Sequence, residues 1–271
     1  MVLHHRRFRL EPRLAWILGE LRESPHAREL TDRTTRLAET QDSPTGQDLG
    51  EALGAHRFLL DRAADGLDLT AAGYLRPAVV RAVADHLPLM QDWRFAVERE
   101  SHTQPVLHFR ESVQRAGLLR KQKGKLLLTS AGKRARSDPA FLWGHLADRL
   151  VTSRRQFDDV AGILVLLHLA TDGDVDTRQI ADLLQALGWR RGDGSPVDRM
   201  DVQWIYNDLW AALGNVGAPV SGRGLLARHP SPEALALIRD ALLEEAPWED
   251  PADGVAQAAP SLSLRFVPNE D

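Results

Sequence analysis

Residues 104–130 read QPVLHFRESVQRAGLLRKQKGKLLLTS, and this stretch decides the interpretation of the fold. Its first half predicts an amphipathic helix over about Pro105–Ala116, because apolar residues recur there at helical spacing. These residues are Val106, Phe109, Val113 and Ala116. Gly117 follows at the position where many helices end in a left-handed glycine. The pattern therefore predicts both the buried face of a helix and its end.

The second half of the stretch predicts a β-hairpin followed by another helix. Two short apolar runs flank Lys123-Gly124, a dipeptide suited to a tight turn between strands. Thr129 or Ser130 can cap the helix that follows. Asp138-Pro139 then closes the unit.

The residues before this stretch supply the other elements of a small domain. Leu67–Leu87, LDLTAAGYLRPAVVRAVADHL, predicts a short extended piece, a turn at Gly73 and a helix that begins at Pro77. Helix, helix, hairpin and helix in that order are typical of a winged helix. In that fold the helix before the hairpin reads the nucleic acid and the hairpin is the wing. We therefore expect a basic winged-helix-like domain over residues 67–150.

Charge is distributed unevenly along the chain. The net charge of the 271 residues is −4, yet the segment from Arg110 to Arg136 carries nine basic residues against a single acid, Glu111. All four lysines of the chain lie in this segment, between Lys121 and Lys133. A basic segment on an otherwise acidic chain favours contact with a polyanion.

Eight residues are the candidates for nucleic-acid contact. A stripe opposite the apolar face of the predicted helix carries side chains able to hydrogen-bond base edges: Gln104, His108, Glu111 and Arg115. The predicted wing carries cations suited to phosphate contact: Arg120, Lys121, Lys123 and Lys125. The alternative is a solvated hairpin on a protein-interaction module, since lysines also protect exposed strands from aggregation.

Four segments in this region resemble the C-terminal region of an actinobacterial family, the plasmid orf-three-like or insertion-element passenger proteins. They are LTAAGYLRPAVV (Leu69–Val80), ERESHTQPV (Glu98–Val106), GLLRKQKGKLLLTSAG (Gly117–Gly132) and FLWGHLADRL (Phe141–Leu150). The resemblance extends more weakly to about Leu243 and so covers roughly two thirds of the chain. It implies a bacterial source and a helical, winged architecture. The family has no established activity, so it implies no catalytic residue.

The remaining segments complete a mainly α fold. We expect a helical N-terminal platform over residues 1–66 and a second, looser winged-helix-like unit over 151–243. An acidic, disordered tail is expected over 244–271. In the second unit, Leu164, Leu166, Leu167 and His168 are expected in the core. The two tryptophans Trp204 and Trp210 are expected in a core or an interface.

Other classes of function lack a sequence signal. The chain has no cysteine, which excludes disulfides and cysteine-based zinc sites and fits a cytoplasmic location. It has no apolar stretch suited to a signal peptide or a membrane span. The ten histidines show no metal-ligand spacing, and no phosphate-binding loop, dinucleotide fingerprint or nucleophile elbow occurs. We therefore expect no metal, no cofactor, no catalytic residue and no enzymatic activity.

The sequence thus predicts a DNA-binding or DNA-associated accessory or regulatory protein, with duplex DNA as the partner of the basic wing. The alternative is a non-enzymatic scaffold that docks proteins, or a second copy of itself, through its winged-helix-like units. The second unit favours that alternative, because its predicted third helix carries Asp198, Asp201 and Asp208 against Arg199. These acids would repel phosphate.

Overall fold

The computed structural model describes residues 7–39, 42–91, 93–152, 155–218, 229–246 and 261–263. Within them the chain is mainly helical with two small antiparallel sheets, which confirms the predicted fold class at that level. The α-helices are α1 (Pro12–Glu20), α2 (Ala27–Ala38), α3 (Gly46–Ala52), α4 (Gly54–Arg62), α5 (Pro77–Ala84), α6 (Gln104–Arg115), α7 (Ser130–Ser137), α8 (Pro139–Leu150), α9 (Gln156–Asp172), α10 (Thr177–Ala186), α11 (Arg199–Leu213) and α12 (Pro232–Leu242). The strands are β1 (Arg7–Leu10), β2 (Leu67–Asp68), β3 (Leu119–Gln122), β4 (Lys125–Leu128), β5 (Leu243–Ala246) and β6 (Ser261–Ser263), and the 3-10 helices are η1 (Pro88–Met90) and η2 (Glu100–His102).

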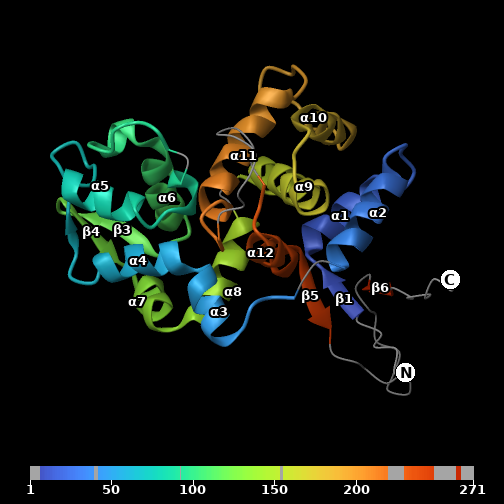
Figure 1. Ribbon diagram of the computed structural model, residues 1–271. Coiled ribbons are helices and arrows are strands. Elements are labelled where there is room, and N and C mark those ends of the chain that lie inside the picture. The colour runs from blue at the N-terminus through green and yellow to red at the C-terminus, as the bar shows by residue number, and fades with distance from the viewer. Residues whose placement is uncertain are drawn as a thin grey trace.

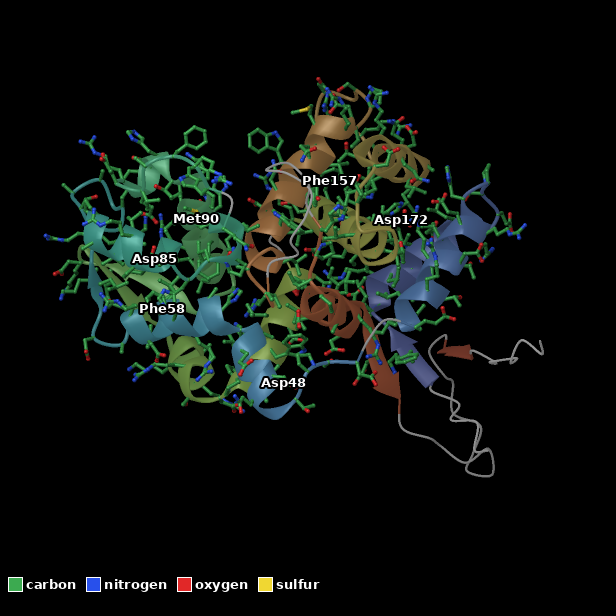
Figure 2. All side chains as sticks on the ribbon, in the orientation of Figure 1. Asp48, Phe58, Asp85, Met90, Phe157 and Asp172 are labelled. Carbon is green, nitrogen blue, oxygen red and sulfur yellow. The ribbon has the colours of Figure 1, made fainter. Side chains whose placement is uncertain are left out.

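These elements form two lobes (Figure 1). The hairpin lobe contains α4 to α7 with β2, β3 and β4, and the bundle lobe contains α1, α2, α9 to α12 and the strands β1, β5 and β6. Helices α3 and α8 lie between the lobes, and α11 packs directly on α6 across them. Figure 2 places Phe58 and Asp85 in the hairpin lobe and Phe157 and Asp172 in the bundle lobe.

The hairpin lobe is organised around a three-stranded sheet of order β2-β4-β3. Lys123 and Gly124 both have positive φ, 48° and 73°, and form the two-residue turn between β3 and β4. Such a turn matches the twist of the paired strands. The predicted hairpin at this dipeptide is confirmed. Leu126 and Leu128 of β4 turn their side chains into the core.

Helix α6 agrees closely with its prediction. Val106, Phe109 and Val113 are at most 1% exposed, and Gly117 takes φ 77° just beyond the helix end. Arg110 is also buried: its Nε donates to Oε1 of Glu100 at 2.7 Å. The other oxygen of Glu100 accepts from the backbone N–H of Leu75 at 2.6 Å. This buried pair ties the segment before α6 to the turn before α5.

The bundle lobe surrounds a central helix, α9, whose residues from Val160 to Leu169 are all buried. The expected core residues Leu164, Leu166 and Leu167 are each 0% exposed, which confirms that prediction. His168 is a core residue as expected, with its Nδ1 2.8 Å from the carbonyl oxygen of Leu164. Helices α1, α2, α10, α11 and α12 all pack on α9.

Helix α11 differs from expectation in one respect. Trp210 is 8% exposed and packs in the core, whereas Trp204 is 70% exposed. Of the two places expected for the tryptophans, a core or an interface, the core is confirmed for Trp210 and is wrong for Trp204. Asp198 caps the helix and shares a capping box with Asp201. Over residues 220–243 the sequence predicts a small wing and a closing helix; the helix is α12, whereas residues 220–228 lie outside the described part of the chain.

A second small sheet joins the two ends of the chain. Strand β1 pairs antiparallel with β5 on one side and with β6 on the other. The prediction of a disordered tail over residues 244–271 is therefore wrong at Glu244–Ala246 and Ser261–Ser263, which form strands. The other residues of that segment lie outside the described part. The composition of the tail gave no sign of these strands, because they form by pairing with the two free edges of β1, whose backbone N–H and C=O groups need partners.

Candidate functional site

The predicted stripe lies along one face of α6. Gln104, His108 and Arg115 are exposed, and Glu111 is half-buried. They face away from the buried residues of the same helix because their spacing of three or four residues keeps them in register. The structure therefore brings the four stripe residues to one surface, as the sequence indicated.

The hairpin brings its four cations close to that surface. Arg120, Lys121, Lys123 and Lys125 are all exposed. Partial burial lowers the pKa of Lys121 and the nearby Arg110 lowers it further, whereas the carboxylates of Glu100 and Glu111 raise it. Strand β3 packs on α6. We call the stripe and the hairpin together the α6–hairpin surface.

Several arginines and one lysine of the basic segment have acidic partners. Besides the buried Arg110, Lys125 lies 3.3 Å from Asp68, and Arg136 Nε donates to Asp61 at 2.9 Å. Arg134 lies 3.9 Å from Asp138 and over the Phe141 ring. By contrast, four cations have no ion pair with another described residue: Arg120, Lys121, Lys123 and Lys133. The local positive excess at the surface is therefore smaller than the sequence count suggests, and it is concentrated on the hairpin.

Arg115 marks the end of the α6–hairpin surface nearest the bundle lobe. Its Nη2 lies 3.4 Å from Oδ1 of Asp208 on α11, and the two side chains are 46% and 67% exposed. An ion pair this exposed contributes at most ~1 kcal/mol. Arg115 can therefore exchange Asp208 for another anion at little cost.

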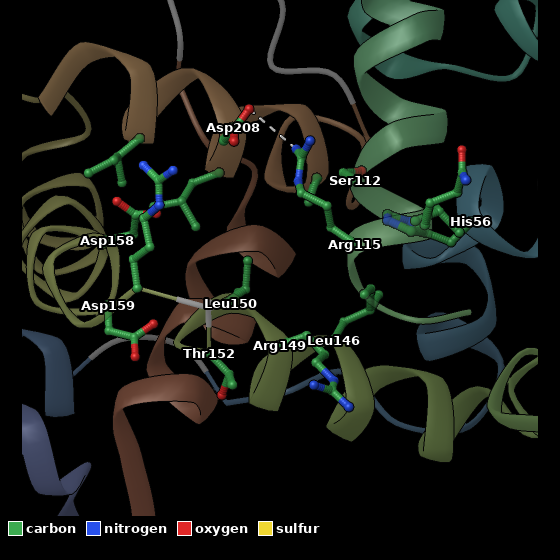
Figure 3. A pocket seen from close by; sticks show the side chains of 18 residues that line it. His56, Ser112, Arg115, Leu146, Arg149, Leu150, Thr152, Asp158, Asp159 and Asp208 are labelled. Carbon is green, nitrogen blue, oxygen red and sulfur yellow. Dashed lines mark ion pairs between the residues drawn. The ribbon is translucent and has the colours of Figure 1, made fainter. Parts of the chain in front are cut away.

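Next to Arg115 the two lobes enclose a cavity of about 710 Å³ (Figure 3). Its walls come from α4, α6, α8, α9 and α11 and the segment between α8 and α9. On α8 the lining residues Leu146, Arg149 and Leu150 share one face, and on α11 so do Ile205, Asp208 and Leu209. Sequence reasoning did not find this cavity, because it is formed by residues from distant parts of the chain.

His56 of α4 lines the cavity at the side of the hairpin lobe. It is 0% exposed, and burial lowers its pKa from 6.5 to about 4, so the imidazole is neutral near neutral pH. Its ring stacks edge-on against Phe109 with centroids 4.9 Å apart. Neither ring nitrogen has a hydrogen-bond partner among the described residues. Figure 3 shows the ring directed toward the centre of the cavity.

The wall formed by α9 is acidic. Burial raises the pKa of Asp158 above its ordinary value, Arg155 lowers it, and the carboxylates of Asp159 and Asp208 raise it further. Asp159 is held by Arg13, whose Nη1 lies 2.8 Å from its Oδ2. Among the charged residues around the cavity, Arg149 is exposed and has no ion pair with any described residue.

No family model, curated protein or solved structure matches the chain. Among the described residues, no three metal-binding side chains lie together in a way that could hold an ion. In the same residues no helix has the length and apolar character needed to cross a bilayer.

Proposed function

We propose that this protein binds duplex DNA through the α6–hairpin surface, with the hairpin lobe acting as a winged helix. The observation that carries the proposal is the group of cations on and beside the hairpin that no described acid pairs, next to the exposed face of α6. The sheet order β2-β4-β3, with α6 immediately before the hairpin, is the order expected of a winged helix. The protein acts in this proposal as a binding protein and not as an enzyme.

The two parts of the surface have different roles. Arg120, Lys121 and Lys123 contact phosphates and hold the domain on the duplex whatever its sequence. Gln104 and His108 of α6 lie where a helix in the major groove presents side chains to base edges. Glu111 is offset by Arg110, whose Nη2 lies 3.7 Å from its Oε1. Arg115 contacts the DNA after its ion pair with Asp208 breaks.

The test is a salt titration of binding to random duplex DNA. The variant carries Arg120→Gln, Lys121→Gln and Lys123→Asn, since asparagine tolerates the positive φ of the turn. Its control carries Arg22→Gln, Arg28→Gln and Arg178→Gln, which remove the same charge from exposed positions of the bundle lobe. The slope of log affinity against log salt should become shallower by about 0.9 for each phosphate that is no longer neutralised, in the hairpin variant alone.

Two results would refute the proposal. One is a wild-type protein that does not bind DNA even at about 50 mM salt, where electrostatic affinity is strong. The other is an equal loss of affinity in the hairpin variant and in its control, which would mean that net charge alone drives binding. Both variants must have the same melting temperature as the wild type.

A second candidate function, docking of a protein, is favoured by one observation. Trp204 and Met200 lie one turn apart on α11 and are 70% and 45% exposed. Large exposed apolar side chains at this spacing are typical of helix-mediated association. Sedimentation of the wild type and of Trp204→Ser tests self-association, and identical monomeric profiles would exclude it.

A further inference from the structure

The cavity between the lobes has the properties of a binding site for a small molecule. Its volume of about 710 Å³ lies within the range of small-ligand sites, roughly 300–1,000 Å³. Apolar side chains of α6, α8 and α11 form much of its wall, and charged groups stand at separate points around it. Walls of this mixed kind orient a ligand through a few polar contacts and bury the rest of it.

The imidazole of His56 is a second, independent sign of a ligand. A neutral imidazole has one donor and one acceptor, and both are buried here without a partner among the described residues. Such groups are costly when unpaired, so in most proteins a side chain, a water molecule or a ligand satisfies them. The ring borders the cavity (Figure 3), and its two nitrogens lie beneath the cavity surface.

The charged side chains around the cavity indicate the charge of that ligand. Arg115, Arg149 and Arg155 line the cavity with Asp158, Asp159 and Asp208. Arg13 pairs with Asp159 from outside the described lining residues, which reduces the negative charge that Asp159 presents to the cavity. Arg115 is already paired with Asp208, so Arg149 is the cation most available to an incoming anion.

Between His56 and Arg149 the wall is apolar. Leu146 and Leu150 lie on α8 on either side of Arg149 (Figure 3), and Leu209 of α11 also lines the cavity. Gly162 of α9 lines the cavity beside Leu209, and a Cβ at that position would make an ordinary contact with the leucine Cδ1 at 3.9 Å. An apolar ligand body therefore fits between the two polar contacts.

We propose that the cavity binds a small organic anion with an apolar, ring-sized body. Its anionic group pairs with Arg149, its body packs on the leucines of α8 and α11, and a polar atom at its inner end hydrogen-bonds His56. This proposal does not rest on the proposed nucleic-acid function, because none of these three contacts involves the hairpin.

The experiment uses two matched pairs of probes on the full-length protein, indole-3-acetate with indole-3-acetamide and benzoate with benzamide. Each acid differs from its amide mainly in charge. Binding is measured by titration with NMR of ¹³C-labelled leucine methyl groups, and the His56 ring is monitored by its own ¹⁵N resonances. We expect indole-3-acetate to bind about tenfold more tightly than its amide, since hydrogen bonds to charged groups are the stronger kind. Leucine shifts should be confined to the cavity.

Three variants assign the contacts. Arg149→Gln should abolish the preference for the acid and leave the affinity of the amide unchanged. His56→Phe should lower the affinity for the acid and for the amide alike, by about tenfold. Arg81→Gln, at an exposed arginine outside the lining, should change neither affinity. If His56→Phe does not fold, Ala212→Phe fills the same cavity from α11 and should exclude both probes.

The proposal is overturned if neither acid binds at millimolar concentration. It is also overturned if each acid and its amide bind equally, or if Arg149→Gln behaves as Arg81→Gln does. Failure here leaves the DNA titration unaffected, since that experiment contains no probe and alters no residue of the cavity.

Discussion

Replacing His56 by phenylalanine should make the protein more resistant to acid. The side chain is fully buried, packs edge-on against Phe109 and makes no hydrogen bond to a described residue through either nitrogen. Phenylalanine has a similar ring and no polar atom to leave unpaired. Because the pKa of His56 is about 4 in the folded state and 6.5 as the ordinary value, protons bind the unfolded chain first as the pH falls.

The sign and size of the effect follow from proton linkage. Between pH 6.5 and about 4 the unfolded state holds a proton that the folded state does not, so folding stability falls with pH across this window. Each unit of pKa difference is worth about 1.4 kcal/mol. The wild type should therefore lose about 2 kcal/mol relative to His56→Phe between roughly pH 7.5 and 5, and about 3 kcal/mol by pH 4.

The assay is urea denaturation of both proteins across this range of pH, with tryptophan fluorescence as the probe of unfolding. Subtracting the free energy of unfolding of the wild type from that of the variant at each pH isolates the contribution of His56, because other titrating groups are common to both. They include His168, whose pKa is also lowered by burial. If the free energies of unfolding of the two proteins differ by the same amount at every pH from neutral to acidic, His56 is not a buried, neutral imidazole with a lowered pKa. At neutral pH the variant should be at least as stable as the wild type, since it removes two unpaired buried groups.

Three further predictions concern the folded state. Leu166→Ala, at a residue 0% exposed on α9, should lower the free energy of unfolding by ~2–5 kcal/mol in urea, whereas Met200→Ala on the surface should cost far less. Glu100→Gln should cost ~3–5 kcal/mol because it leaves Arg110 charged and buried, and hydrogen exchange at the Leu75 amide should speed up; an unchanged midpoint would contradict this. Gly132→Ala should destabilise, because its Cβ would lie 2.1 Å from the carbonyl oxygen of Leu118, whereas Gly144→Ala has open space and should gain ~0.5–1 kcal/mol in melting experiments.

Some parts of the fold could be predicted because they depend on local backbone requirements. The turn at Lys123-Gly124 and the end of α6 at Gly117 each require positive φ, which glycine adopts without strain. Thr129, one of the two caps expected for the helix after the hairpin, accepts a hydrogen bond from the backbone N–H of Gly132 in the first turn of α7. Signals of this kind lie within a few residues of the structure that they determine, so one sequence is enough to find them.

Other parts depend on which distant segments meet. Glu100 neutralises Arg110 only because η2 packs beside α6, and Asp208 reaches Arg115 from the other lobe. Counting charges along the chain therefore overstates the charge at the surface. The sequence does not reveal the cavity for the same reason, although one local signal existed: His56 lies on the buried face of α4 with Ala55, Leu59 and Leu60.

Arg115 connects the two proposed sites. Of the eight residues predicted to contact nucleic acid, it is the one that also lines the cavity. Its ion pair with Asp208 is exposed and contributes at most ~1 kcal/mol, so small changes in the local potential can decide its partner. An anion in the cavity would attract the guanidinium away from Asp208 and from the outer surface, whereas a DNA phosphate would attract it outward. The two anions therefore compete for a single side chain, and by reciprocity each weakens the binding of the other by the same factor.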